Sequence, residues 1–221
     1  MSRGRRTAEV ARASLPSVLG NRQAWAIAAG RFFTDPVWYI YLFWVPDFLS
    51  RTRHLDLREM ALPLFLIYSG ATGGSVAGGW LSSLLLKRNW SLNKSRKTAL
   101  LVCALAAVPV SYAAMGASAW VAVALVALAA GAHQGWSANM YTLASDMFPR
   151  ASVGTVVGFS SMIGAIGGIF AAKTVGYILQ WTGSYVLVFA IASIAYLVAF
   201  AMVELLAPVI ERVSLSTEPV A

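Results

Sequence analysis

Residues 25–49, WAIAAGRFFTDPVWYIYLFWVPDFL, decide the fold of this chain. The stretch is almost entirely apolar or aromatic, and it is long enough for a helix that crosses a bilayer. Arg31, Asp35 and Pro36 lie well inside it, where a segment that only fills lipid avoids charge. The stretch is therefore predicted to be a membrane-spanning helix that carries polar chemistry near its centre.

Arg31 and Asp35 are four residues apart, so both lie on one face of a helix and are expected to form an ion pair. Pairing would reduce the cost of burying each charge in lipid. Pro36 donates no backbone hydrogen bond, so the helix is expected to kink or loosen at residues 32–36. Two interpretations are equally open: the pair stiffens a kinked helix, or it binds or gates a solute.

An aromatic stripe follows on the same helix, because Thr34, Trp38 and Tyr41 recur at spacings of four and three residues. The usual role of such a stripe is packing against neighbouring helices. The alternative is that its rings stack against a sugar.

Composition places the chain in a membrane. Of its 221 residues, 58% are hydrophobic and only 12% are charged, and the mean hydropathy is +0.67. A soluble domain of this size could not hide so much apolar surface. The basic residues behind the net charge of +8 lie between apolar runs. They are therefore interpreted as loop charges that orient the protein in the membrane, and not as a surface that binds nucleic acid. No nucleic acid, cofactor or metal is expected.

The apolar runs predict an all-α integral membrane protein. Residues 1–23 are expected to form a basic cytoplasmic arm or linker, and residues 208–221 a cytoplasmic tail. The basic stretch 87–97 and the short loop 146–150 are expected on the same side, so both termini are placed in the cytoplasm. The six predicted transmembrane helices cover residues 24–49, 61–86, 98–115, 120–143, 152–179 and 185–206.

Small residues indicate where helices pack closely. Gly70, Gly74 and Gly78 recur every four residues in the second helix, a pattern that lets two backbones approach in lipid. The fifth helix is rich in glycine and carries Ser160, which is expected either to add a hydroxyl to a solute cavity or to bond back to its own helix. The sixth helix is almost featureless and is expected to face lipid.

The fourth helix carries an unusual polar cluster in the middle of its span. His133, Trp136 and Ser137 share one face, with Gln134 beside it and Asn139 further round. That face is expected to look into the bundle. A single histidine there is typical of a satisfied core residue, but a cluster of hydrogen-bonding groups with a tryptophan favours contact with a polyhydroxylated solute.

Three groups of residues form local motifs: Thr34, Asp35, Pro36, Trp38, Tyr41, Phe43, Trp44 and Pro46; Gly79, Ser83, Lys87, Arg88, Arg96 and Lys97; and His133, Gln134, Trp136, Asn139, Ser145, Asp146, Phe148 and Pro149. Together they resemble the C-terminal half of a major facilitator superfamily transporter, and most closely the anion:cation symporter branch that includes hexuronate transporters. The second group resembles the superfamily's signature loop, which has an acid where Ser83 stands here.

The resemblance implies secondary active transport of a small carboxylated sugar, such as a hexuronate or an aldonate, together with protons. Two six-helix halves would alternate access around a site at the membrane midplane. It also implies a bacterial cytoplasmic membrane, and that the carboxylate-binding arginine and the proton-carrying acids lie mainly in the N-terminal half. We therefore expect a fragment, a half with a separately encoded partner, or two assembled copies.

The candidate site follows from these observations together. Arg31 and Asp35 are the candidate intramembrane ion pair or coupling residues. The candidate substrate contacts are Asp35, Trp38, Tyr41, His133, Gln134, Trp136, Asn139 and Ser160.

Two alternatives stay open. An integral-membrane enzyme would need a convergent nucleophile, base or metal cluster, but His54 and His133 lie far apart and no carboxylate motif accompanies His133. No enzymatic activity is therefore expected. A non-transporting half, a truncated or regulatory remnant that needs a partner, is the other alternative.

Overall fold

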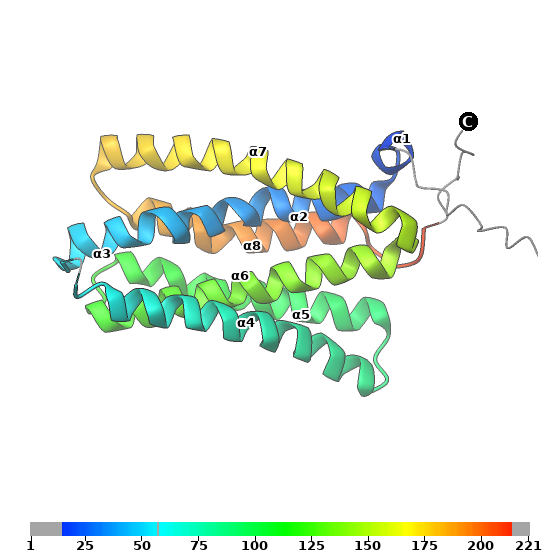
Figure 1. Cartoon of the computed structure of the whole chain (residues 1–221), viewed down its shortest axis with the longest axis horizontal. Coiled ribbons are helices and arrows are strands. Elements are labelled where there is room, and N and C mark those ends of the chain that lie inside the picture. The colour runs from blue at the N-terminus through cyan, green and yellow to red at the C-terminus, as the bar shows by residue number, and fades with distance from the viewer. Residues whose placement is uncertain (1–14, 57, 214–221) are drawn as a thin grey trace, which may run out of the picture.

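The computed structural model describes residues 15–56 and 58–213, and Figure 1 shows long helices running side by side. Within the described residues there is no strand. The elements are α1 (Leu15–Leu19), α2 (Arg22–Tyr39), the π-helical turn η1 (Ile40–Trp44), α3 (Val45–Arg53), α4 (Ala61–Lys87), α5 (Leu92–Ala107), the 3₁₀ segment η2 (Val108–Ala114), α6 (Ala119–Met147), α7 (Arg150–Thr182) and α8 (Val186–Leu206).

The predicted all-α membrane class is confirmed. Four helical runs of the described chain are long and apolar enough to cross a membrane: Leu92–Ala114, Ala119–Met147, Arg150–Thr182 and Val186–Leu206. The other two predicted spans are less apolar, because α2 holds Arg22, Arg31 and Asp35 and α4 is rich in glycine and serine. Both belong to the same bundle, since α2 packs on α6, α7 and α8, and α4 packs on α5 and α6.

The connections alternate between the two ends of the bundle. The links from α3 to α4, from η2 to α6 and from α7 to α8 lie at one end in Figure 1. The links from α4 to α5 and from α6 to α7 lie at the other end, together with α1 and the chain that follows α8. We call this second end the basic end, because Lys87, Arg88 and Arg150 belong to it.

The first predicted helix is longer than expected and irregular in a different place. The α-helical pattern continues through Pro36, and the departure from it comes at η1, one turn later. The change in backbone hydrogen bonding therefore falls after the expected residues 32–36, and a kink at Pro36 stays a prediction. Gly164 and Gly167 of α7 pack closely on Phe32, Asp35 and Pro36. The helical path then runs to Arg53, four residues beyond the predicted end of the first helix at residue 49.

The basic stretch 87–97 is mostly not a loop. Ser91 caps the N-terminus of α5 by accepting from the backbone of Lys94 at 3.3 Å, so the helix starts well before residue 98. Arg96 and Lys97 are only 7% and 9% exposed. They are not solvated as the charges of a basic loop usually are, because carboxylates from α6 and α8 pair with them.

The prediction that the sixth helix, α8, faces only lipid is also wrong. Its residues Phe189, Tyr196 and Val203 are at most 1% exposed, and they pack on α2, α5 and η2. Ile194, on the other side of the helix, is 56% exposed. The apolar sequence concealed this division, since one face is buried in protein and the other is turned outward.

The predicted glycine packing of α4 is confirmed. Gly74 lies so close to the backbone of Gly131 in α6 that a Cβ would not fit, and Gly78 lies equally close to Gly135. Asn139 strengthens the same contact, because its Nδ2 donates to the carbonyl of Gly78 at 3.0 Å. Close backbone approach therefore joins α4 to α6, the helix that carries the predicted polar cluster.

Candidate functional site

The predicted ion pair between Arg31 and Asp35 is confirmed. Nε of Arg31 donates to Oδ2 of Asp35 at 3.0 Å, and Nη2 lies 3.0 Å from the same oxygen. The two side chains are 11% and 18% exposed. The guanidinium carbon of Arg31 also lies 4.8 Å from the ring centre of Tyr141, in a cation–π arrangement. Arg31 therefore contacts a carboxylate on its own helix and an aromatic ring from α6.

Asp35 is held from the other side by α7. Its carboxylate lies against Gly164, which has no room for a side chain. The carboxylate is thus confined between the Arg31 guanidinium and the backbone of a third helix. A proton or an anion that disturbs the pair would also act on the contact between α2 and α7.

A stack of rings lies next to this pair and connects three helices. Trp38 of α2 stacks on His133 of α6 with ring centres 5.0 Å apart and an interplanar angle of 13°. Nδ1 of His133 shares a hydrogen bond with the hydroxyl of Tyr196 at 2.7 Å. Trp136 meets the edge of Tyr196, with ring centres 5.9 Å apart. Of the predicted residues, the structure therefore brings Trp38, His133 and Trp136 together.

Tyr196 is the member of this stack that the sequence interpretation missed. It is fully buried at the centre of an otherwise apolar α8. The only signal in the sequence is a single phenol in the middle of a helix that otherwise looks like lipid filler. A buried tyrosine hydroxyl normally has a partner, and here the partner is His133.

Three of the predicted contacts are closed off from solute in this conformation. Tyr41, Trp136 and Asn139 are 0%, 1% and 1% exposed. The Tyr41 hydroxyl, Trp136 Nε1 and Asn139 Oδ1 have no hydrogen-bond partner among the described residues. Their assignment as substrate contacts stays a prediction, and the donor bonds of Asn139 to α4 and to its own helix give it a structural task as well.

The remaining two candidate substrate contacts, Gln134 and Ser160, are not part of the ring stack. Gln134 is half-buried beside His133. Ser160 is fully buried and donates to the carbonyl of Val157 at 3.0 Å, which is the back-bonded arrangement considered above. A solute role for either residue stays a prediction.

The signature-loop residues form an ion-pair network at the basic end. Arg96 donates to Asp146 at 2.7 Å and to the hydroxyl of Ser82 at 2.8 Å. Lys97 donates to Glu204 at 2.6 Å. Arg96 therefore finds its carboxylate on α6, in Asp146.

The other hydroxyl-bearing or charged residues of the signature loop take no part in these ion pairs. Ser83 only donates to the carbonyl of Gly79 at 2.9 Å, and Lys87 and Arg88 are exposed. The network therefore ties α4, α5, α6 and α8 together at the basic end of the bundle.

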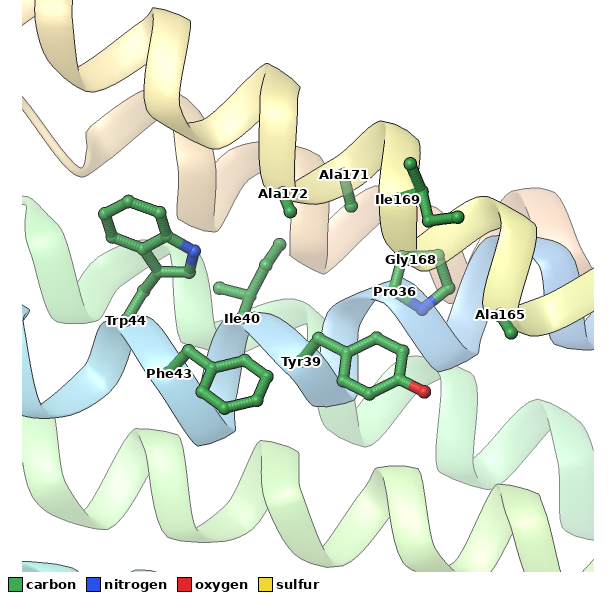
Figure 2. A pocket seen from close by; sticks show the side chains of 10 residues that line it. All are labelled: Pro36, Tyr39, Ile40, Phe43, Trp44, Ala165, Gly168, Ile169, Ala171 and Ala172. Atoms are coloured by element: carbon green, nitrogen blue, oxygen red, sulfur yellow. The ribbon is translucent and has the colours of Figure 1, made fainter.

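A separate cavity of about 300 Å³ lies between the α2–η1 segment and α7 (Figure 2). Its lining is apolar apart from the Tyr39 hydroxyl and the Trp44 indole nitrogen, and it contains no charged side chain. A carboxylated sugar would find no partner for its charge there. Across residues 15–56 and 58–213, no group of three or more His, Cys, Asp or Glu side chains could hold a metal ion.

Comparison with known proteins identifies the family of this bundle. The sequence profile described as the Major Facilitator Superfamily matches residues 2–172. The chain belongs to the Major Facilitator Superfamily. The resemblance inferred from the motifs of the first, second and fourth predicted helices is therefore confirmed.

The relatives within the superfamily are similar over much of this chain but are longer than it. A hexuronate transporter of Escherichia coli K12 is 30% identical over 173 residues, which is 77% of this chain and 40% of that protein. A probable galactarate/D-glucarate transporter of Bacillus subtilis is 27% identical over 171 residues, covering 77% and 37% of the two chains.

A D-galactonate transporter of Escherichia coli O6:H1 is 26% identical over 167 residues, covering 74% of this chain and 38% of that protein. The matched region therefore spans about two-fifths of the length of these relatives.

Proposed function

We propose that this superfamily chain is one six-helix half of a secondary active transporter for small carboxylated sugars, driven by protons. The observation that carries the proposal is the Arg31–Asp35 pair, a guanidinium and a carboxylate that are largely buried inside the helix bundle. The names of the relatives support the substrate class, because they specify hexuronate, galactarate or glucarate, and galactonate.

The pair offers a simple route to coupling. A proton on Asp35 would neutralise the carboxylate and release the Arg31 guanidinium from it. The carboxylate of a sugar acid would then take the place of Asp35, because arginine binds carboxylates through the same donors. Loss of the proton would restore the internal pair and expel the anion. Asp35 would thus serve as the proton carrier and as a stand-in for the substrate in its absence.

Aromatic side chains beside the pair suit the rest of the ligand. Tyr141 lies under Arg31 and is 44% exposed, and Trp38 is half-buried and held in place by His133. Rings of this kind stack well against the apolar faces of sugars. We infer that the sugar ring lies along Tyr141 and Trp38 with its carboxylate at Arg31.

The exposure of Tyr141 and of α7 also supports a second half. Gly154 and Gly158 of α7 have no atom of the described chain within 4 Å of the place where a Cβ would be. Exposed glycines of this kind suit the close approach of another helix in lipid. We propose that an N-terminal six-helix half, or a second copy of this chain, covers this face and completes alternating access.

We further propose a bacterial cytoplasmic membrane as the location, with the basic end and both termini on the cytoplasmic side. A non-transporting half is the second candidate function. It is supported by the matched length, which is about two-fifths of each relative.

Uptake of labelled glucuronate and galacturonate into proteoliposomes tests the proposal. The chain is reconstituted alone and together with the N-terminal half of a hexuronate transporter, with and without an inward proton gradient. Gradient-dependent uptake in either preparation, abolished by Arg31→Gln, is the expected result. Absence of uptake in both preparations would contradict the transport function and favour the non-transporting half.

A further inference from the structure

A cavity with charged side chains, separate from the proposed transport site, lies at the basic end. It has a volume of about 840 Å³ and is formed where α6 ends, α7 begins and the chain after α8 passes by. Two arginines line it from different segments, Arg150 at the first residue of α7 and Arg212 near the end of the described chain. Its other lining residues are Ser145, Phe148, Pro149, Val153 and Val213.

The segment that carries Arg212 is fixed by three hydrogen bonds. Lys97 Nζ donates to the carbonyl of Pro208 at 2.7 Å, and the backbone of Ile210 donates to Asn93 Oδ1 at 3.0 Å. The backbone of Val213 donates to the carbonyl of Met147 at 2.8 Å. These contacts tie residues 208–213 to α5 and α6. Arg212 is therefore held over the turn between α6 and α7, facing the same cavity as Arg150.

The two positive charges have no counter-ion among the described residues. Both arginines are exposed, and within the described part of the chain the side chain of neither one makes a hydrogen bond or an ion pair. Two acids at this end of the bundle already have partners, since Asp146 pairs with Arg96 and Glu204 pairs with Lys97. Glu211 is exposed and does not line the cavity.

Arg150 lies at the N-terminus of a helix, where a positive charge is electrostatically unfavourable. It stands in the first turn of α7, which contains no acidic residue, and Pro149 provides no side-chain cap. The positive end of the helix dipole disfavours a cation there. An anion bound in the cavity would be favoured both by this helix dipole and by the two guanidiniums.

We propose that this cavity binds a phosphate-bearing anion, held between the Arg150 and Arg212 guanidiniums. Guanidinium groups bind phosphate oxygens through paired, charge-assisted hydrogen bonds, which matches two arginines that converge on one cavity. The Ser145 hydroxyl, whose proton goes to the Tyr141 carbonyl at 3.3 Å, keeps its lone pairs for a protonated phosphate oxygen or a headgroup hydroxyl. The phosphate belongs either to the headgroup of an anionic lipid at the basic end of the bundle or to a soluble phosphate.

Lipid titrations of the full chain, followed by native mass spectrometry, test the site. The probes are phosphatidylglycerol, phosphatidylethanolamine as the zwitterionic reference, and inorganic phosphate without lipid. The variant Arg150→Gln/Arg212→Gln is compared with Lys87→Gln/Arg88→Gln, which removes two exposed charges from the same end but outside the cavity. Circular dichroism verifies that both variants keep the helical content of the wild type.

The expected result is that Arg150→Gln/Arg212→Gln binds phosphatidylglycerol about tenfold or more weakly than the Lys87→Gln/Arg88→Gln control. Binding of phosphatidylethanolamine should be the same in both. If only inorganic phosphate binding is lost, the occupant is a soluble phosphate. Equal binding of both anions by the two variants would overturn the proposal, because the charge would then act only through the general surface potential.

Discussion

The carboxylate of Asp35 lies directly against Gly164, in the space that a side chain at position 164 would occupy. Because the same carboxylate accepts from Arg31, α7 presses the ion pair of α2 into one geometry. The geometry of the pair therefore depends on both α2 and α7, so a substitution in α7 can alter it while both charges stay in place.

Gly164→Ala should displace Asp35 and weaken its pairing with Arg31. The new methyl group would overlap the carboxylate, and overpacking of this kind costs about 1–3 kcal/mol of stability. Gly158→Ala on the same helix is the matched control, since no atom lies within 4 Å of its new Cβ. Thermal unfolding in detergent and sugar-acid uptake measure the two effects. Equal behaviour of the two variants would show that α7 does not constrain the pair.

Arg31 and Asp35 should be strongly coupled in a double-mutant cycle. Arg31→Gln or Asp35→Asn alone leaves one charge in a largely buried site, while the double variant leaves none. The double variant should therefore be more stable than the sum of the single effects indicates, by about 1–3 kcal/mol. Denaturant or thermal unfolding of the four proteins gives the coupling energy. Simple additivity would mean that the two charges do not stabilise each other.

Tyr196→Phe should destabilise the bundle although it removes only one oxygen. His133 would lose its buried hydrogen-bond partner, and an unsatisfied buried polar group costs about 1–3 kcal/mol. Tyr112→Phe is the control, because Tyr112 is 57% exposed. Comparison of the two melting curves tests the expectation, and a Tyr196→Phe protein as stable as the Tyr112→Phe protein would mean that the His133 bond contributes little.

Adjacent glycines of α4 should respond very differently to alanine. At Gly74 the new Cβ would meet the backbone of Gly131, which cannot move aside as a side chain does, so α4 and α6 must separate. At Gly73 there is nothing within 4 Å. Gly74→Ala should cost at least about 2 kcal/mol, while Gly73→Ala should be close to neutral. Similar melting temperatures for the two would contradict the close contact between these helices.

The sequence predicts the class of fold, the Arg31–Asp35 pair and the glycine contact because each depends on local spacing. Four residues place two charges on one helical face, and a glycine every fourth residue lines one side of a helix. The family resemblance also rests on short local motifs. These features hold whatever the rest of the bundle does.

The features that were mispredicted depend on contacts between segments distant in the sequence. Arg96 and Lys97 look like loop charges until Asp146 and Glu204 reach them from α6 and α8. Tyr196 is unremarkable in α8 until His133 lies opposite it. Periodicity says which face of a helix is polar, but it does not say which helix packs against that face.

The most direct test of the proposed function is the pH dependence of glucuronate binding by the wild type and by Asp35→Asn, in the assembly that transports. Glucuronate stays ionised between about pH 6 and 8, so a pH effect reports on the protein. If a proton on Asp35 frees Arg31, the wild type binds more tightly as the pH falls, whereas Asp35→Asn binds tightly at every pH. Asp35→Asn with the same pH dependence as the wild type would contradict the account.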